Sequence, residues 1–332
     1  MDIRGSKVFV TGGCGFIGSH LVEALVERNC QVTCLVEYNS ELDLGLLKEV
    51  DPKITSKVKF VHGDLLDTEF LKANMQGCDY LFHLAAVISI PYSYYGTRHT
   101  VLTNVIGTLN VLQAAKETGI KKMVHTSTSE TYGSAQYVPI DEKHPIVCQS
   151  PYSASKFGAD KLVESFHLSF GLPVVTVRPF NCFGERQSPR AVIPTIIIQA
   201  LQGGEKGDIK LGNIHTTRDY THAQDTAQGF IRAMETEGNE GQVFNISSNF
   251  EISIKEIAER VIAQINPALK IVIDEQRIRP ENSEVQRLCG DNTKAREVLG
   301  WKPELTFNQG LEQAIAYYRK KITQLRPGEY YI

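Results

Sequence analysis

The sequence predicts an α/β protein whose core is a doubly wound parallel sheet. Along residues 7–181, short apolar runs of strand character alternate with segments whose apolar residues recur at helical spacing. The strand-like runs are apolar nearly throughout, which is typical of strands buried on both faces of a parallel sheet. A glycine-rich turn joins the first run to the first helical segment. This alternation places the chain in the α/β class.

Each element follows from its own residues. Strands are expected in the apolar runs at residues 7–13, 31–38, 58–64, 79–87, 121–127 and 173–181. Helices are expected where apolar residues recur every three or four positions, at residues 18–30, 104–119, 153–171, 253–265 and 308–321. Beyond residue 182 the segments shorten, and Gly, Pro, Arg and Asp cluster between isolated helices. We therefore expect a main domain over residues 1–182 and a smaller α/β lobe, mainly for substrate, over residues 183–332.

Composition excludes several classes of protein. The chain has 332 residues, 42% of them hydrophobic, and a net charge of -3 without a long basic run, so no nucleic-acid partner is expected. Its seven scattered cysteines lack metal-ligand spacing, which predicts reduced thiols in a cytoplasmic protein and no metal site. No apolar run reaches about 18 residues, and MDIRGSK has no signal-peptide character, so neither a membrane span nor export is expected.

The turn TGGCGFIGSH places Gly12, Gly15 and Gly18 at the junction of the first strand and the first helix. Glycines here permit a tight turn and let backbone N–H groups approach a pyrophosphate at a helix N-terminus. A glycine pattern alone is a weak signal, and its position at the start of a βαβ unit strengthens it. The turn predicts a Rossmann-type domain that binds a dinucleotide through Gly12, Gly15, Phe16, Ile17 and Gly18.

Two further strand ends extend the predicted dinucleotide site. In GDLLD, Asp64 can accept a hydrogen bond from the adenine amino group, while the Leu65 amide pairs with a ring nitrogen. In HLAA, the residues Leu84, Ala85 and Ala86 let the dinucleotide pass close to the backbone. Either motif alone is an ordinary strand end as often as it is a cofactor contact. Together with the glycines they favour a cofactor site at the carboxyl ends of the strands.

The motif PYSASK places Tyr152 and Lys156 four residues apart, on one face of a helix. A cation close to a phenol favours the phenolate, so we expect Lys156 to lower the pKa of Tyr152 from its usual value of about 10. Such a tyrosine can take a proton from an alcohol near neutral pH. The pair alone is usually a solvated helix face. Its position directly after the fifth strand makes it a candidate catalytic pair.

The strand end KKMVHTSTSETYG gathers six hydroxyl side chains, from Thr126 to Tyr132, around one carboxylate, Glu130. Together with the glycine turn, GDL, HLAA, NVIGTLNVL, YSASK and RPFNCFG, it resembles the extended short-chain dehydrogenase/reductase family of nucleotide-sugar enzymes. The resemblance covers nearly the whole chain, through TRDYTHAQDTA, RPENSEV and GDNTKAREVLGWKP. Within it, STSE is similar to the loop of GDP-mannose 4,6-dehydratases. The stretch RQSPRAVIPTII is most similar to the GDP-N-acetylglucosamine 4,6-dehydratases of legionaminic acid biosynthesis.

The resemblance implies a 4,6-dehydration: oxidation at sugar carbon 4, loss of water across carbons 5 and 6, then return of the hydride to carbon 6. It implies that Tyr152 deprotonates the 4-hydroxyl, that Thr128 orients this hydroxyl, and that Lys156 tunes the tyrosine and holds the cofactor ribose. Glu130 is then the base that removes the carbon 5 proton. Ser129 stands where dTDP-glucose dehydratases carry Asp. The departing hydroxyl is therefore protonated either through water relayed by Ser129 or by Glu130 itself.

The end of the second strand bears on the choice between NAD and NADP. An acid there binds the ribose diol of NAD, whereas an Arg favours NADP. Val36 occupies the usual acid position, Glu37 follows it, and no Arg or Lys lies between Arg28 and Lys48. Dehydratases with this loop typically use NADP, which leaves NADP as the alternative. The missing cation leads us to expect NAD, bound in part by Glu37.

Substrate contacts are expected mainly from the second half of the chain. Arg218 and Arg279 are candidates for the diphosphate, because a guanidinium fork matches phosphate oxygens. Asn181 is a candidate amide contact, and Arg190 a contact to base or phosphate. Ser89 and Thr128 complete the predicted substrate set. Arg178 suits either a phosphate or a structural ion pair.

Three other functions are alternatives to the dehydratase. A UDP-glucuronate decarboxylase shares the STSE loop but has a different tyrosine motif, and a sugar-nucleotide 4-epimerase would leave Glu130 idle. A nucleotide-sensing regulator would not need Thr128, Tyr152 and Lys156 together.

The helices at residues 103–119 and 153–171 carry more apolar positions than one buried face needs. We therefore expect a homodimer through a four-helix interface, unless the C-terminal lobe covers the surplus.

Overall fold

The central sheet is parallel and seven-stranded, with the strand order β10-β6-β5-β4-β1-β2-β3. The computed structural model describes residues 1–204, 207–277 and 286–324. The strands of this sheet are β1 (Lys7–Thr11), β2 (Gln31–Glu37), β3 (Lys59–Gly63), β4 (Tyr80–His83), β5 (Lys122–Thr126), β6 (Val174–Pro179) and β10 (Val243–Ile246). The reversal of order at β1 defines the doubly wound topology, so the predicted fold class is confirmed.

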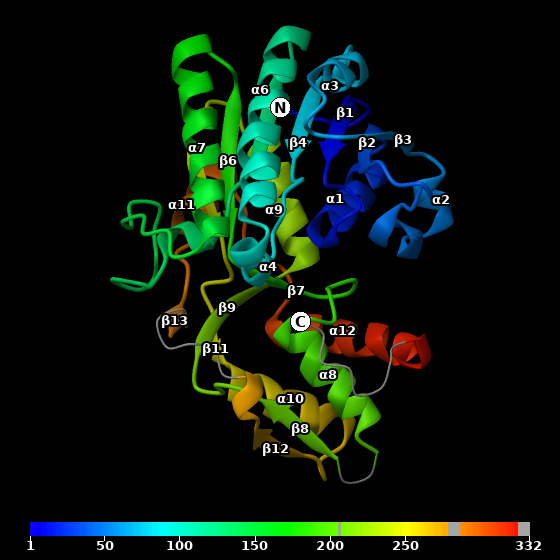
Figure 1. The fold of residues 1–332 in the computed structure, drawn as a ribbon, viewed down its shortest axis with the longest axis vertical. Helices are drawn as coiled ribbons and strands as arrows, with labels where there is room; N and C mark the ends of the chain where they lie inside the picture. Colours follow the sequence, from blue (N-terminus) through cyan, green and yellow to red (C-terminus); the bar gives the residue numbers. More distant parts are fainter. Residues whose placement is uncertain (205–206, 278–285, 325–332) are drawn as a thin grey trace.

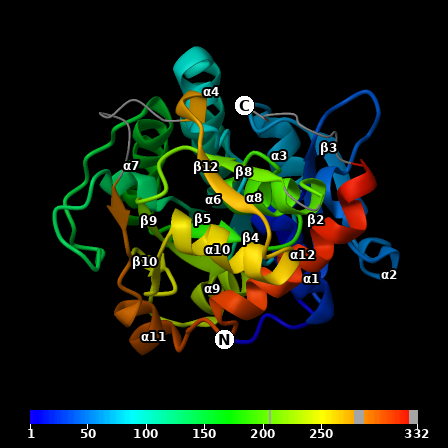
Figure 2. The same ribbon diagram turned by 90° about the horizontal axis from the view of Figure 1, so that it is seen from below.

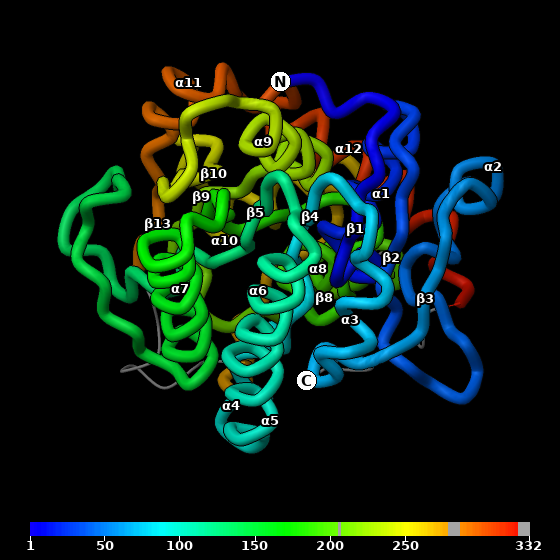
Figure 3. Tube along the Cα trace, turned by 90° about the horizontal axis from the view of Figure 1, so that it is seen from above, coloured from blue at the N-terminus to red at the C-terminus, as the bar shows by residue number. Residues whose placement is uncertain are grey.

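Helices cover both faces of this sheet (Figure 3). On one face lie α3 (Thr68–Met75), α6 (Gly107–Thr118) and α7 (Pro151–Phe170). On the other face lie α1 (Phe16–Glu27), α9 (Ala223–Glu235) and α11 (Thr293–Leu299). Each face buries its own apolar cluster, which explains why the strands are apolar nearly throughout. The sheet is therefore the middle layer of three.

The helix expected at residues 104–119 is longer and less regular than its sequence pattern predicts. It is preceded by α4 (Ile90–Tyr95) and α5 (Thr97–Val101), and a π-helical turn (Leu102–Ile106) joins α5 to α6. Single π turns inside helices are often found at functional sites. This turn carries Asn104, a fully buried polar residue.

A smaller lobe lies at the other end of the molecule, below the sheet in Figure 1. Its first sheet contains β7 (Asn181–Phe183), β9 (Thr217–His222), β11 (Glu251–Ser253) and β13 (Arg287–Leu288), and β8 (Asp208–Leu211) pairs with β12 (Lys270–Ile273). The helices α8 (Val192–Gln202), α10 (Ile254–Ile265) and α12 (Phe307–Lys321) pack around a separate apolar core. Capping boxes at Ser253 and Thr306 begin α10 and α12 close to the predicted positions.

The chain crosses between the two sheets after residue 182. Helix α9 packs on α1, and β10 pairs in parallel with β6 as an edge strand of the central sheet. The sequence did not predict this seventh strand, a four-residue strand at the edge of the sheet. The division of the chain near residue 182 stays a prediction, with α9 and β10 as later segments that belong to the first sheet.

Short helical turns complete the described structure. They are η1 (Gly45–Glu49), α2 (Pro52–Thr55), η3 (Ser129–Tyr132), η4 (Glu275–Arg277) and η6 (Ile322–Gln324). Within the described ranges, none of the helices combines the length and the apolar character that a membrane crossing requires.

Candidate active site

The predicted dinucleotide site is built on close backbone packing at the carboxyl end of β1. Gly12 has a φ of 73°, and a Cβ there would lie 2.5 Å from the Ala85 nitrogen. At Gly18 a Cβ would lie 2.1 Å from the Gly12 carbonyl oxygen. Neither position has room for a side chain. The glycine-rich turn and the Leu84–Ala85 backbone therefore lie against each other, as a shared floor for a bound dinucleotide would require.

A buried histidine at the end of β4, His83, fixes this floor. Thr108 donates its hydroxyl hydrogen to the Asn104 carbonyl and therefore accepts from His83 Nε2, at 3.0 Å. The Nδ1 atom of His83 then accepts from the Thr11 hydroxyl at 2.7 Å, and Thr11 accepts from the Ala85 amide at 3.2 Å. Burial holds the pKa of His83 well below its ordinary value. A neutral imidazole thus orients the HLAA segment.

The hydroxyl-rich loop turns directly after β5. Thr128 begins η3, and its side chain accepts a hydrogen bond from the Glu130 amide at 3.2 Å. Thr128 and Ser129 are buried, while Glu130 is half-buried. The turn of η3 therefore holds the Thr128 hydroxyl inside the protein and presents Glu130 at the edge of the site.

The candidate pair Tyr152 and Lys156 lies in the first turns of α7. A capping box between Ser150 and Ser153 begins this helix, with Pro151 at its first position. Both side chains of the pair are buried. The helix start is thus fixed locally by sequence, and it sets the pair beside η3.

The pKa of Tyr152 shifts in the direction opposite to the one expected from the sequence. Burial raises it, the charges of Glu130 and Asp160 raise it further, and a hydrogen bond with Thr128 opposes them. The expected lowering by Lys156 is therefore wrong for the protein without its ligands, because burial of the phenol and the two carboxylate charges outweigh the hydrogen bond with Thr128. The hydrogen bond with Thr128 and the charge of Glu130 both act on the Tyr152 phenol, so these three side chains lie close together.

Behind this pair lies a buried polar network centred on Asp160, one helical turn after Lys156. Asp160 accepts hydrogen bonds from Ser127 at 2.7 Å, Arg178 at 3.0 Å and His125 at 3.1 Å. Burial raises the pKa of Asp160, yet the hydrogen bonds and charges of His125 and Arg178 outweigh burial and hold it below its usual value. Arg178 therefore forms the structural ion pair that was one of its two readings. Burial lowers the pKa of Lys156 to about 8, and the Asp160 charge limits that fall.

Asn104 is a second contributor that the sequence analysis missed. Its side chain accepts from the Val87 amide at 2.7 Å and donates to the Val87 carbonyl at 3.0 Å. It also donates to the Ser155 hydroxyl at 2.9 Å. It thereby joins the segment after β4 to α7, beside Lys156. A polar residue opening the apolar run NVIGTLNVL was the available signal.

At the adenosine end of the predicted cofactor site, the residues lie at the carboxyl ends of β2 and β3. Glu37 is the last residue of β2 and is exposed. Asp64 is exposed after β3 and accepts from the Leu66 amide at 2.9 Å. The Leu65 carbonyl accepts from Asn110 at 3.0 Å, which ties this strand end to α6. The structure thus gathers the predicted adenosine contacts at one edge of the sheet.

The predicted substrate residues are spread over several elements. Asn181 and Arg218 lie on the paired strands β7 and β9, where Asn181 donates to the Asp219 carbonyl at 3.4 Å and Arg218 to the Thr217 carbonyl at 2.9 Å. Ser89 is the N-cap of α4. Arg190 is exposed between β7 and α8. The remaining candidate, Arg279, lies outside the described residues.

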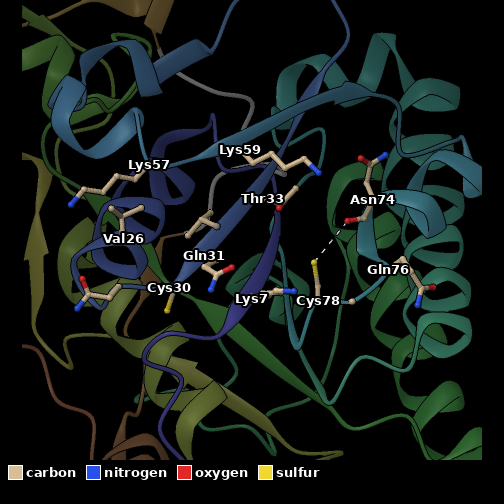
Figure 4. Close-up of a pocket in the computed structure, with 13 residues that line it drawn as sticks. Lys7, Val26, Cys30, Gln31, Thr33, Lys57, Lys59, Asn74, Gln76 and Cys78 are labelled. Carbon is tan, nitrogen blue, oxygen red and sulfur yellow. Dashed lines mark hydrogen bonds between the residues drawn. The ribbon is translucent and has the colours of Figure 1, made fainter.

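A cavity of about 670 Å³ lies at the amino ends of the strands of the central sheet, opposite the predicted dinucleotide site (Figure 4). It is lined by the first residues of three strands, Lys7, Gln31 and Lys59. Doubly wound sheets bind ligands at the carboxyl ends of their strands, so this cavity is not the site of the chemistry. Helices α1 and α3 end beside it.

The strand order, the glycine turn and a Thr–Tyr–Lys set between β5 and α7 define an enzyme of the extended short-chain dehydrogenase/reductase class. Comparison with known proteins then gives the family. Residues 9–314 match the family described as GDP-mannose 4,6 dehydratase. The chain belongs to this family of nucleotide-sugar dehydratases and related epimerases.

The relatives include both activities. A dTDP-glucose 4,6-dehydratase of Actinoplanes sp. is 32% identical over 94% of this chain and 98% of its own length. A putative UDP-glucose 4-epimerase of Methanocaldococcus jannaschii is 31% identical, again over 94% of this chain and 98% of its own length. The structure of a dTDP-glucose 4,6-dehydratase from Streptomyces venezuelae with NAD bound is similar at a TM-score of 0.84 and 29% identity, covering 97% of this chain and 99% of that one.

Proposed function

We propose that this protein is an NAD-dependent nucleotide-sugar 4,6-dehydratase. The observation that carries the proposal is the position of Glu130, whose charge acts on the Tyr152 phenol. Oxidation at sugar carbon 4 needs one base, for the 4-hydroxyl proton. Elimination of water needs a second base, for the proton on carbon 5. A half-buried carboxylate beside the tyrosine supplies that second base.

The residues present fit a dinucleotide. The glycine turn approaches the Leu84–Ala85 backbone so closely that a Cβ at Gly12 or Gly18 would collide, which leaves main-chain amides as the groups available to a pyrophosphate. Glu37 would accept from the adenosine ribose and Lys156 would hold the second ribose. NAD is favoured over NADP by Glu37 and by the NAD held in the solved Streptomyces relative.

A bound nicotinamide would supply the acceptor for the hydride of sugar carbon 4 and the donor that returns it to carbon 6. The chain's own residues move the protons. Tyr152 takes the proton of the 4-hydroxyl. Thr128, which is hydrogen-bonded to the Tyr152 phenol, orients this hydroxyl. Lys156 carries a positive charge below its pKa of about 8, and this charge would offset part of the cost that burial imposes on the phenolate form of Tyr152.

The η3 turn supplies the groups for the elimination step. Once carbon 4 is a ketone, the carbon 5 proton becomes acidic, and Glu130 removes it. The carbon 6 hydroxyl leaves with a proton, either from Glu130 or from water held by Ser129. Because Ser129 is buried and Glu130 is half-buried, Glu130 is the group better placed to exchange protons with solvent after each cycle.

For the substrate we propose GDP-N-acetylglucosamine, on the resemblance of residues 186–197 to dehydratases that act on it. Asn181 and Arg218 would contact the diphosphate from the adjacent strands β7 and β9. The test is incubation of the purified protein with GDP-, UDP- and dTDP-linked hexoses and detection of a 4-keto-6-deoxy product by mass spectrometry. The expected result is such a product from the GDP-linked amino sugar. Turnover of a UDP- or dTDP-sugar alone would overturn the substrate assignment.

A 4-epimerase is the second candidate, favoured by the similarity to a putative UDP-glucose 4-epimerase. Deuterium oxide separates the two reactions. A dehydratase that uses Glu130 as base introduces deuterium at carbon 5 and removes the 6-hydroxyl. An epimerase leaves both positions unchanged and inverts carbon 4.

The cofactor is tested independently. Denaturing the purified protein releases its bound dinucleotide, which chromatography identifies. We expect NAD, because a 2′-phosphate would meet the like charge of Glu37. Release of predominantly NADP would contradict the assignment of Glu37.

A further inference from the structure

Residues 38–50, between β2 and α2, form a wall beside the predicted adenosine site. It begins directly after Glu37. Asn39 accepts from the Asp43 amide at 2.8 Å, and Asp43 accepts from the Gly45 amide and from Lys48, both at 2.7 Å. Leu47 and Val50 are buried in the core of the main domain. The segment is therefore ordered by its own hydrogen bonds and anchored at its far end.

One side of this wall contacts the glycine-rich turn. The Leu46 amide donates to the Cys14 carbonyl at 3.0 Å. Gly45 adopts a φ of 57°, and a Cβ there would lie 2.8 Å from the same carbonyl oxygen. Movement of residues 38–50 away from the protein would break this contact. The position of the wall and the position of the turn are thus linked.

The other side of the wall contacts the C-terminal lobe through Glu49. One carboxylate oxygen accepts from the Tyr317 hydroxyl, and the other forms an ion pair with Lys321. The Lys321 ammonium also lies 5.0 Å from the centre of the Tyr317 ring. The side chains of Glu49 and Lys321 are 23% and 27% exposed, so this contact is partly shielded from water. Burial and the Glu49 carboxylate raise the pKa of Tyr317, which keeps its hydroxyl a donor.

Helix α12, which carries both partners of Glu49, is itself fixed at the junction of the two lobes. Tyr318 donates to the Gln187 carbonyl, and Gln187 donates to the Cys182 carbonyl at 2.7 Å. Next to Gln187, the guanidinium of Arg186 pairs with Glu23 of α1. In Figure 1, α12 lies in the smaller lobe, below α1 and α2, and Figure 2, seen from below, shows it in front of α1. The helix can therefore act as a fixed anchor for the wall.

We propose that Glu49, Tyr317 and Lys321 form a latch that holds residues 38–50 over the adenosine half of the dinucleotide and slows its release. The inference rests on the proposed function, in which the cofactor ends each cycle in the state in which it began it. Such an enzyme gains nothing from cofactor exchange and loses turnover whenever a reduced dinucleotide escapes. The latch residues are positioning residues, because they act on the dinucleotide through the wall and the glycine turn.

The test measures the release of bound dinucleotide. The full-length protein is loaded with NADH, whose fluorescence is followed after addition of excess NAD. Glu49→Ala removes both contacts, Tyr317→Phe removes only the hydroxyl, and Glu49→Gln keeps an acceptor for Tyr317 while losing the ion pair. We expect Glu49→Ala to speed release by at least about fivefold, since a partly exposed charge-assisted contact has a modest net strength. Tyr317→Phe and Glu49→Gln should each give a smaller increase.

Glu259→Ala is the matched control, because Glu259 pairs with Lys255 at 3.8 Å on α10, in the lobe but away from the wall. It should release NADH at the wild-type rate. Combining Glu49→Ala with Tyr317→Phe should add nothing to Glu49→Ala alone, since the contact is already lost. Wild-type release rates in all three latch variants would overturn the latch while leaving the proposed function intact. Lower melting temperatures with unchanged release would also overturn it, because they indicate a structural role only.

Failure of the proposed function has a different signature. In that case the wild-type protein itself would fail to bind NADH or to form a 4-keto-6-deoxy product. A latch defect appears only as a difference between variant and wild type in the rate of NADH release.

Discussion

At the residue scale, burial sets the protonation of Tyr152 and Lys156, the candidate catalytic pair. The pKa of Tyr152 is raised and that of Lys156 is lowered to about 8, so both groups are driven towards their neutral forms. The cause is common to both, since a charge in a dry environment loses its hydration. Asp160 partly offsets this cost for Lys156. The protein thus keeps a charged lysine near neutral pH at some expense in stability.

That expense predicts a pH-dependent gain in stability for Lys156→Met. The lysine titrates near pH 10.5 as a model group and near 8 in the folded protein, so the unfolded chain binds more protons between these values. The cost of the buried charge is complete below pH 8 and disappears as pH rises towards 10.5. We expect the variant to be inactive, and more stable than wild type by about 1–3 kcal/mol at neutral pH. Urea unfolding at neutral pH and at about pH 10 measures the difference, which should shrink at the higher pH. A difference independent of pH would contradict the assignment.

Glu130→Gln separates oxidation from elimination. The amide cannot remove the carbon 5 proton, while Tyr152 and Lys156 remain in place. We expect the variant to bind substrate and to accumulate enzyme-bound reduced cofactor, with product formation slowed by about 10²–10⁴-fold. Ultraviolet absorbance of the reduced dinucleotide and mass spectrometry of the product measure the two steps. Glu164→Gln, at a surface ion pair with Lys161 on α7, is the control. Product release by Glu130→Gln at the wild-type rate would remove Glu130 from the mechanism.

At the element scale, the strand-to-helix turn after β1 depends on two separate properties of glycine. Gly12 needs its left-handed φ of 73°, and it also needs an absent side chain because of the Ala85 backbone. Gly77 has a similar φ of 78° but nothing within 4 Å of an added Cβ. The two positions therefore distinguish backbone strain from steric exclusion.

Replacing each of these glycines by Ala makes that distinction measurable. Both variants should lose about 1 kcal/mol of unfolding free energy from the left-handed conformation. Gly12→Ala should in addition weaken dinucleotide binding by at least about tenfold, because its Cβ pushes the turn away from the HLAA segment. Calorimetric titration with NAD and thermal unfolding measure the two effects. Equal NAD affinities in the two variants would show that the close approach at Gly12 does not form the cofactor site.

At the scale of the whole molecule, the two helices that were expected to form a dimer interface are more deeply buried in their own subunit than predicted. Val111, Leu112 and Ala115 of α6, and Phe166 of α7, lie in the core of the main domain. The apolar surface that remains includes Val101 and Ile106, 40% and 38% exposed along the run that leads into α6. This surplus still needs a partner, so the homodimer stays a prediction.

Sedimentation at micromolar concentration tests that prediction. We expect the wild-type protein to sediment as a dimer, and Ile106→Glu to shift it towards monomer because a charge would enter the interface. Val298→Glu is the control, since Val298 is 42% exposed on α11, on the other face of the sheet. A wild-type monomer, or equal behaviour of the two variants, would contradict the four-helix interface.

Local patterns in the sequence were sufficient for most of the fold. The predicted strands and long helices of residues 7–181 are present, because period and apolar content specify such elements directly. The spacing of Tyr152 and Lys156 and the hydroxyls around Glu130 are likewise local features. The four-residue strand β10 escaped prediction, because an edge strand of that length carries little pattern of its own. Its membership in the central sheet depends on β6, more than sixty residues earlier in the chain.

The sequence by itself determined the doubly wound sheet, the glycine turn and the candidate catalytic residues. Only the tertiary structure decided the direction of the pKa shift of Tyr152, because burial comes from segments distant in sequence. It also decided that Arg178 pairs with Asp160, and that Glu49 meets the C-terminal lobe 268 residues later at Tyr317. The physical reason is the same in each case. Hydrogen bonding within an element is set by neighbouring residues, whereas desolvation and ion pairing depend on which elements the fold brings together.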